Sequence, residues 1–284
     1  MPVEREAEFR TRRGTWAIAA ALVLGNFFLH KPVSDVCDAL FARIGRAPYE
    51  WVMLGGIGAL SLVAALLLAR GGAPALRSPR TLLALAGLAL LTTFAQQTLL
   101  VSNVELIHLP QFGLLAFLLT VAGLPPQTAW LVATLAGALD EAYQWQVIYA
   151  ALPNIYFDWN DIVLNAIGAA WSVILLRGGR AGEPGPGERM LQRLLLPALG
   201  LGFVVALVVA PPSVAPRDAF PFWGPTLKRA LTGFDYHVMP ASEGLGGLLA
   251  VWGLVARRGR EQASATRPQT ASRPPRPSEA GMTW

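Results

Sequence analysis

Four carboxylates stand close together in one segment of an otherwise apolar sequence. The segment, DEAYQWQVIYAALPNIYFDWNDIVLN, covers residues 140–165, and 54% of the whole chain is hydrophobic. Its acidic residues are Asp140, Glu141, Asp158 and Asp161. A carboxyl group that is partly removed from water is suited to general acid or base chemistry, and Glu141 is our candidate for that role. His108 is the candidate partner, and Asp161 completes the predicted catalytic set.

Polar and small residues recur at helical spacing around these carboxylates. One series, with steps of three, four, three and four residues, is Asp158, Asp161, Asn165, Gly168 and Ser172. Such steps place side chains on one face of a helix. Two further polar pairs, three and four residues apart, are Glu105 with His108 and Asp140 with Gln144. Polar groups inside a membrane are costly unless paired, so we expect these faces to meet. The predicted substrate-binding residues are Asp140, Gln144, Asp158, Asn165 and Glu105.

Simpler structural roles remain open for several of these residues. Asp158 or Asp161 could cap the N-terminus of the helix that follows, since short acidic side chains bind free backbone N–H groups there. Asn165 lies too deep to cap, and a polar residue at that depth also serves as a contact between helices. The nearby aromatic residues are typical of a belt at the membrane surface, or could stack on a headgroup. They are Tyr143, Trp145, Tyr149, Tyr156, Phe157 and Trp159.

The distribution of apolar residues predicts an all-α, polytopic membrane protein. The chain has 284 residues and a mean hydropathy of +0.44. The apolar stretches are 15–29, 51–69, 81–98, 106–124, 127–139, 162–176, 194–210 and 244–256. A helix crosses the hydrocarbon layer with about 20 residues, so we predict about eight spans, with seven as the alternative. The first stretch is interpreted as a transmembrane helix and not a signal peptide, because no small-residue cleavage site follows it.

The basic residues predict the orientation of the bundle. Of the 23 Lys and Arg, 17 lie in segments that fall on the same side as the N-terminus if eight helices alternate. Positive residues favour the cytoplasmic side, so both termini are predicted to be cytoplasmic. The basic residues sit between and beyond apolar spans, which argues against a nucleic-acid partner. The single cysteine, Cys37, excludes an internal disulfide and a C-x-x-C redox motif.

Composition also divides the chain into segments. We predict a cytoplasmic N-terminal segment (1–14), a six-span core (15–176), a Gly- and Pro-rich linker (177–193), a two-span rear part (194–256) with an outer loop at 211–237, and a basic tail (257–284). The tail is rich in Pro, Ser, Thr and Arg, which is typical of disorder. With this topology, the candidate site residues all fall at the outer ends of the helices.

The order and spacing of the polar residues resemble the VanZ-like membrane proteins. The resemblance covers about residues 81–176 and lies in the segments HLPQFGLLAFLL, DEAYQ and FDWNDIVLNAIG. The residues that carry it are His108, Asp140, Glu141, Gln144, Asp158, Asp161, Asn165 and Gly168. It implies a multi-pass protein of the bacterial cytoplasmic membrane with a role in the cell envelope and in low-level resistance to the glycopeptide teicoplanin. Members of that family often carry an Arg before the Phe-Asp-Trp stretch, where this chain has Asn154 and Ile155. A function that needs a cation there must use a substrate ammonium, a metal ion or Arg217.

Three functions follow from these observations. The first is an enzyme that binds or modifies an envelope lipid or a lipid-linked glycan, with membrane lipid or a lipid-linked envelope precursor as its partner. The second is a scaffold or headgroup-binding protein without chemistry. The third is a transporter, which the one-sided distribution of polar residues disfavours. No cofactor is assigned. No metal ligands are assigned either, because the sequence lacks H-E-x-x-H or another compact ligand motif, although carboxylate and imidazole side chains that could assist through a metal ion are plentiful.

Overall fold

The computed structural model describes residues 2–70, 79–100, 102–151, 157–176, 227–228, 235–236 and 238–256. These residues form seven α-helices and one small antiparallel pair of strands. The helices are α1 (Pro2–Ile44), α2 (Arg46–Arg70), α3 (Pro79–Thr98), α4 (His108–Val121), α5 (Pro126–Tyr143), α6 (Trp159–Leu176) and α8 (Ala241–Ala256). The strands are β1 (Leu227–Lys228) and β2 (Asp235–Tyr236). The predicted helical fold class is therefore confirmed for the described part of the chain.

Four of the described helices are long and apolar enough to cross a membrane. They are Arg12–Ile44 within α1, Thr81–Thr98, Asn103–Val121 and Trp159–Leu176, and α8 is a shorter apolar helix. The third of these regions begins with a 3₁₀ turn, Asn103–Ile107, which leads into α4. These helices indicate a multi-pass membrane protein. The count of eight spans stays a prediction, because the stretch 194–210 and the linker 177–193 lie outside the described residues, as does the tail 257–284.

Helix α1 is much longer than the sequence predicted. We expected the first span to end at Leu29, but the helix continues to Ile44 through Pro32. Its 43 residues, at about 1.5 Å each, make it about 65 Å long, whereas the hydrocarbon layer is about 30 Å thick. The helix ends where Gly45 adopts a φ of 76°, a conformation that suits glycine. The predicted boundary at residue 15 therefore falls inside a continuous helix.

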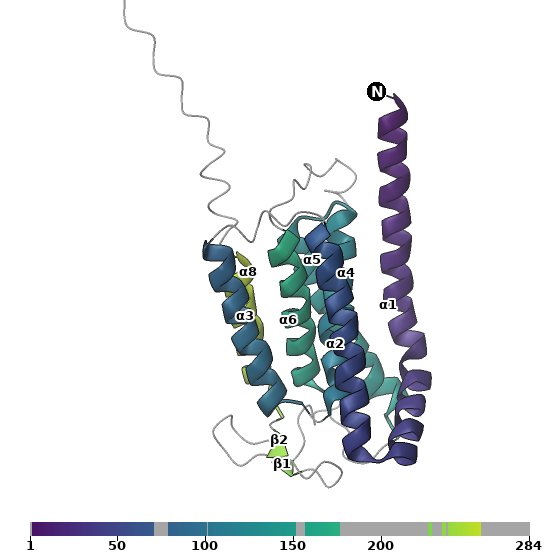
Figure 1. Ribbon diagram of the computed structural model, residues 1–284, viewed down its shortest axis with the longest axis vertical. Coiled ribbons are helices and arrows are strands. Elements are labelled where there is room, and N and C mark those ends of the chain that lie inside the picture. Colours follow the sequence, from purple (N-terminus) through teal and green to yellow (C-terminus); the bar gives the residue numbers. More distant parts are fainter. Residues whose placement is uncertain are drawn as a thin grey trace, which may run out of the picture.

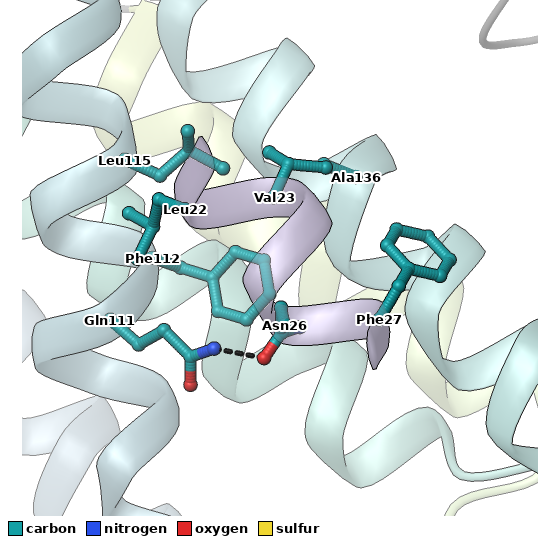
Figure 2. A pocket seen from close by; sticks show the side chains of 8 residues that line it. All are labelled: Leu22, Val23, Asn26, Phe27, Gln111, Phe112, Leu115 and Ala136. Carbon is teal, nitrogen blue, oxygen red and sulfur yellow. Dashed lines mark hydrogen bonds between the residues drawn. The ribbon is translucent and has the colours of Figure 1, made fainter. Parts of the chain in front are cut away.

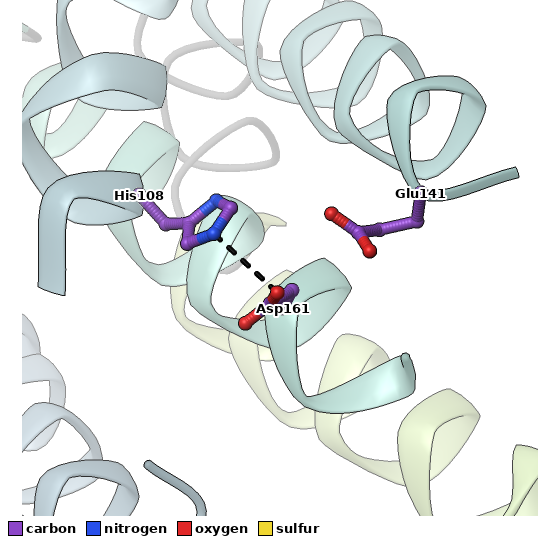
Figure 3. Close-up of side chains that lie close together, drawn as sticks. All are labelled: His108, Glu141 and Asp161. Atoms are coloured by element: carbon purple, nitrogen blue, oxygen red, sulfur yellow. Dashed lines mark ion pairs between the residues drawn. The ribbon is translucent and has the colours of Figure 1, made fainter. Parts of the chain in front are cut away.

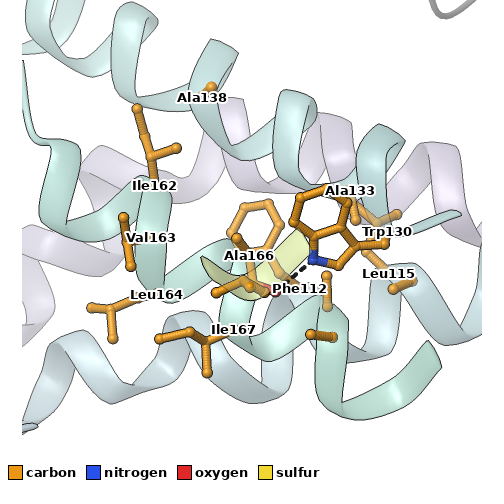
Figure 4. Packing of buried hydrophobic residues seen from close by; sticks show 14 of the residues in the cluster. Phe112, Leu115, Trp130, Ala133, Ala138, Ile162, Val163, Leu164, Ala166 and Ile167 are labelled. Carbon is orange, nitrogen blue, oxygen red and sulfur yellow. Dashed lines mark hydrogen bonds between the residues drawn. The ribbon is translucent and has the colours of Figure 1, made fainter. Parts of the chain in front are cut away.

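Helix α6 lies at the centre of the bundle (Figure 1). It packs against α3, α4, α5 and α8, whereas α1 packs against α2, α4 and α5. The buried side chains between α4, α5 and α6 form the core (Figure 4). Within it, the indole N–H of Trp130 donates a 2.9 Å hydrogen bond to the carbonyl of Ala166. Because α4 and α6 run opposite to α5, the start of α4, the end of α5 and the start of α6 meet at one end of the bundle.

Glycines allow α4 and α6 to approach closely. A Cβ atom on Gly168 would overlap the backbone of Leu109 and lie 3.0 Å from the carbonyl oxygen of His108. A Cβ atom on Gly113 would lie 3.1 Å from the carbonyl oxygen of Gly168. Small residues at such a contact let helix backbones pack against each other inside a membrane. This contact sets the position of α4 relative to α6 along the helix axes.

The predicted aromatic belt is wrong for three of its members. Trp145, Phe157 and Trp159 are buried, with exposed fractions of 6%, 1% and 1%. Their rings pack in sequence, with ring centres 5.8 Å apart for the first pair and 5.4 Å for the second. Burial of these large apolar rings against one another stabilises the fold more than exposure at the surface would. Tyr143 and Tyr149 are half-buried, and Tyr156 lies outside the described residues.

Candidate functional site

Three ionisable side chains from three helices converge at one end of the bundle (Figure 3). His108 begins α4, Glu141 lies near the end of α5, and Asp161 lies in the first turn of α6. One ligand atom from each of the three lies within 4.8 Å of the other two. The Nε2 atom of His108 is 3.4 Å from the Oδ2 atom of Asp161. The sequence predicted that these residues lie at the same end of the bundle, and the structure brings the three together there.

Asn165 orients the imidazole of His108 through a hydrogen bond. Its Oδ1 atom lies 2.8 Å from the Nδ1 atom of His108, and the Asn165 side chain is fully buried. In this orientation the amide oxygen can only accept, so Nδ1 donates its proton. In the neutral imidazole the lone pair then resides on Nε2, the atom that faces Asp161. Asn165 thus has a partner inside the protein, and its predicted contact with a substrate stays a prediction.

Gln144 links the two carboxylates of α5. Its side-chain N–H group donates to Oδ2 of Asp140 and to Oε1 of Glu141, both at 2.9 Å. All three side chains are buried. Gln144 also begins a π-helical turn, Gln144–Ile148, which the backbone bond from Tyr149 N to Gln144 O closes at 2.8 Å. Such turns occur often at functional sites. Here the turn follows directly on the residues that carry the acidic groups.

Helix α1 contributes a polar residue that sequence reasoning missed. Asn26 accepts a hydrogen bond from the side chain of Gln111 (Figure 2). The two amides line a small pocket of about 10 Å³. The available signal was a lone Asn within the apolar stretch 15–29. A polar contact therefore joins α1 to α4.

His30, on the same helix, also lies near the site. The centre of its ring is 6.0 Å from that of Tyr149. His30 also interacts electrostatically with His108 and Asp161. Tyr149 in turn donates from its hydroxyl to Ser34 at 3.2 Å. The extension of α1 beyond Leu29 is what carries His30 and Ser34 to this end of the bundle.

Asp158 and Glu105 lie beside the converging residues. The Oδ1 atom of Asp158 accepts the backbone N–H of Asn160 at 2.9 Å, which is the N-capping bond at the start of α6. The capping alternative is therefore confirmed for Asp158, whose predicted binding of a substrate is untested. Glu105, in the 3₁₀ turn Asn103–Ile107, is half-buried and is not one of the three side chains that converge.

Acidic groups predominate among the described residues of the site. Among the residues that the structure describes, no Lys or Arg forms an ion pair with Asp140, Glu141 or Asp161. His108 is the basic group that faces them. Carboxylates removed from water need a proton, a metal ion or a cationic substrate to balance them. Arg217, which the sequence offered as a distant countercharge, lies outside the described residues.

The site can exchange protons with a bound molecule, since it combines an oriented imidazole with buried carboxyl groups. It is also reachable, because the side chains of His108 and Asp161 retain exposed fractions of 11% and 16%. Its donor set of one imidazole and two carboxylates is one that metal ions bind. A comparison of the chain with protein-family models, with curated proteins and with solved structures finds no match to any of them.

Proposed function

We propose that this protein is a VanZ-like membrane protein of the bacterial cell envelope, which binds or modifies an envelope lipid or a lipid-linked glycan. The observation that carries the proposal is the convergence of His108, Glu141 and Asp161 at one end of a helical bundle. A reactive cluster at the end of membrane-spanning helices lies at the depth of lipid headgroups. In the predicted orientation that end faces outward, where envelope precursors are displayed. A contribution to glycopeptide resistance would follow from a change in such a precursor.

The roles proposed for the three residues follow from their contacts. Glu141 serves as the general acid or base, because it is buried and its carboxylate faces the other two groups. His108 is its partner, with Nε2 directed to the site by the bond from Nδ1 to Asn165. Asp161 orients the substrate or stabilises a charged imidazole. Gln144 keeps the Glu141 carboxylate in place.

A scaffold that binds a headgroup without chemistry is the second candidate. The hydrogen bonds from Gln144 to Asp140 and Glu141 favour it, because they make a rigid polar end to the bundle. Both candidates require the acidic groups to face a ligand. They differ in whether the carboxylates must ionise and exchange protons, which an amide of the same shape cannot do.

The test is a comparison of envelope lipids and lipid-linked glycans by mass spectrometry. A strain that lacks the gene would be complemented at matched protein levels with wild type, Glu141→Gln, Asp161→Asn or the control Asp38→Asn. Asp38 is an exposed residue of α1 and does not belong to the cluster, so its variant removes one carboxylate without changing the proposed site. We expect deletion to change at least one species, and only wild type and the control to restore it.

Other outcomes separate the candidates. If Glu141→Gln and Asp161→Asn both restore the wild-type profile, proton transfer by the carboxylates is excluded and the binding scaffold is favoured. If deletion changes no lipid or glycan species, modification of such a species is excluded and the enzyme candidate is overturned.

A further inference from the structure

The atoms of the cluster are spaced as ligands of one metal ion would be. Zinc bonds to nitrogen and oxygen of about 2.0–2.1 Å in a tetrahedral site place two ligand atoms about 3.4 Å apart. His108 Nε2 and Asp161 Oδ2 are 3.4 Å apart. An oxygen of Glu141 lies within 4.8 Å of both, and the flexible Glu side chain can close that distance. We propose that His108, Glu141 and Asp161 bind one divalent transition-metal ion, of the zinc and manganese type.

The groups behind these ligands are those that a metal site uses. A metal-bound histidine usually donates its other ring N–H to an oxygen, which fixes the tautomer and the direction of the ring. The 2.8 Å contact from His108 Nδ1 to Asn165 Oδ1 is such a bond, and it leaves the Nε2 lone pair directed at Asp161. Gln144 donates to Oε1 of Glu141 at 2.9 Å and so supports the second carboxylate. Two of the three ligands are therefore oriented by buried partners.

The charge and the burial of the site favour a cation with high charge. Two carboxylates converge here, with a third, that of Asp140, hydrogen-bonded beside them through Gln144. Within the described part of the chain, no Lys or Arg balances them. The Oδ1 atom of Asp140 is buried without a hydrogen-bond partner there, which leaves further negative charge uncompensated. A single divalent ion in contact with one imidazole and two carboxylates would neutralise both of those carboxylates at once.

The mixed donor set also narrows the kind of ion. Calcium and magnesium prefer oxygen ligands throughout, whereas imidazole suits zinc and iron, and carboxylates also suit manganese. Three protein ligands leave at least one position open, as in sites that bind water or substrate. The partial exposure of His108 and Asp161 provides a path for the ion and for that fourth ligand. An ion held here would offer its open position to a phosphate or carbonyl oxygen of a headgroup.

This inference deepens the proposed function, since it concerns the same three residues, and the identity of a headgroup ligand rests on that function. Ion binding itself does not require a lipid substrate. The test therefore uses purified full-length protein in detergent, with any affinity tag removed, and the metal ion alone as the probe. After treatment with a chelator, the protein is equilibrated with Zn²⁺ or Mn²⁺, and bound metal per chain is measured by mass spectrometry.

The variants are His108→Gln, Glu141→Gln and Asp161→Asn, with Asp38→Asn as the matched control. We expect one ion per chain in wild type and in the control, with at least a 100-fold weaker affinity in each site variant. Asn165→Ala should weaken binding by about 10- to 100-fold, as outer partners of metal ligands do. Equal affinity in wild type and the three site variants overturns the inference, as does the absence of bound Zn²⁺ and Mn²⁺ from folded wild type.

A second variant gives a gain of signal and does not depend on a loss that misfolding could cause. In a Cys37→Ser background, Asp161→Cys supplies the one thiol of the chain. Bound Co²⁺ should then show a thiolate charge-transfer absorption band, and Asp38→Cys in the same background should show none. The absence of the band from a folded Asp161→Cys protein counts against the site.

The two proposals fail separately. If the envelope lipids depend on Glu141 and Asp161 but no ion binds, the metal inference is overturned and the proposed function stands. If the ion binds and the envelope lipids and glycans are unchanged by deletion, the metal site stands and the proposed modification of an envelope species is overturned.

Discussion

The Nδ1 atom of His108 lies 2.8 Å from the Oδ1 atom of Asn165, and this bond ties the first residue of α4 to the inner face of α6. It sets which nitrogen of the imidazole is available to the site. Because Asn165 is fully buried, water does not compete for its amide oxygen. The imidazole is therefore held in one tautomer, with Nε2 towards Asp161.

Replacement of Asn165 by Ala should release that tautomer. The chain has three histidines, so ¹⁵N spectra of histidine-labelled protein resolve few signals, and His30→Gln and His108→Gln assign them. In wild type at a pH where His108 is neutral, we expect the proton on Nδ1. In Asn165→Ala we expect a substantial population with the proton on Nε2. Ser172→Ala, on the same face two turns along α6, is the control and should leave the signal unchanged. An unchanged tautomer in Asn165→Ala would show that another group orients the ring.

Gly168→Ala should destabilise the bundle, although Ala is the better helix former. The added Cβ would overlap the backbone of Leu109, which cannot move as a flexible side chain would. Overpacking of this kind costs about 1–3 kcal/mol. The control is Gly56→Ala in α2, where a Cβ meets no atom within 4 Å, and where the gain in helix propensity is at most about 1 kcal/mol. Thermal unfolding in detergent should show a lower midpoint for Gly168→Ala and an unchanged or higher one for Gly56→Ala. Equal midpoints would mean that α4 and α6 separate without cost.

Variants of Asp158 distinguish a helix cap from a group that must carry charge. Asp158→Asn keeps an oxygen for the backbone N–H of Asn160, so it should retain stability. Asp158→Ala removes the cap and should lower stability by about 0.5–2 kcal/mol. If the carboxylate serves only as a cap, Asp158→Asn also restores the envelope profile in the complementation experiment. Loss of function in a stable Asp158→Asn protein would instead support the predicted role in substrate binding.

The predicted orientation can be tested with single cysteines in a Cys37→Ser background. Ala150 is exposed and follows α5 at the end that carries the cluster, whereas Gln127 lies at the opposite end of the same helix. We expect a membrane-impermeant maleimide to label Ala150→Cys in intact cells and to label Gln127→Cys only after the cells are opened. Labelling of Gln127→Cys alone in intact cells would reverse the orientation and place the cluster on the cytoplasmic side, contrary to the proposed function.

The spacing of residues along the chain already predicted much of the site. The steps of three and four from Asp161 to Asn165 and Gly168 placed them on one face of a helix, and that face is the one that α4 packs against. The alternation of apolar spans placed His108, Glu141 and Asp161 at the same end of the bundle. Both deductions depend on local geometry alone, because a helix repeats every 3.6 residues and neighbouring spans run in opposite directions.

The tertiary structure decided which groups on those faces touch. The periodicity of the sequence does not predict the position of α4 relative to α6 along the helix axes. The contact between Gly168 and the backbone of Leu109 sets that position. Periodicity also does not say that Gln144 bridges Asp140 and Glu141, since residues on one face can still point to different neighbours. The burial of Trp159 was missed because an aromatic residue near a helix end suits either a core or a surface.

The sequence by itself determined a membrane bundle with acidic and histidine residues at one end, because hydropathy and helical spacing are properties of a chain read in order. Only the tertiary structure decided that Asn165 serves His108 and that Asp158 caps α6. It also extended α1 past Leu29 to Ile44. These are contacts between residues far apart in the chain, or choices of partner among several within reach, and the packing of whole helices selects them.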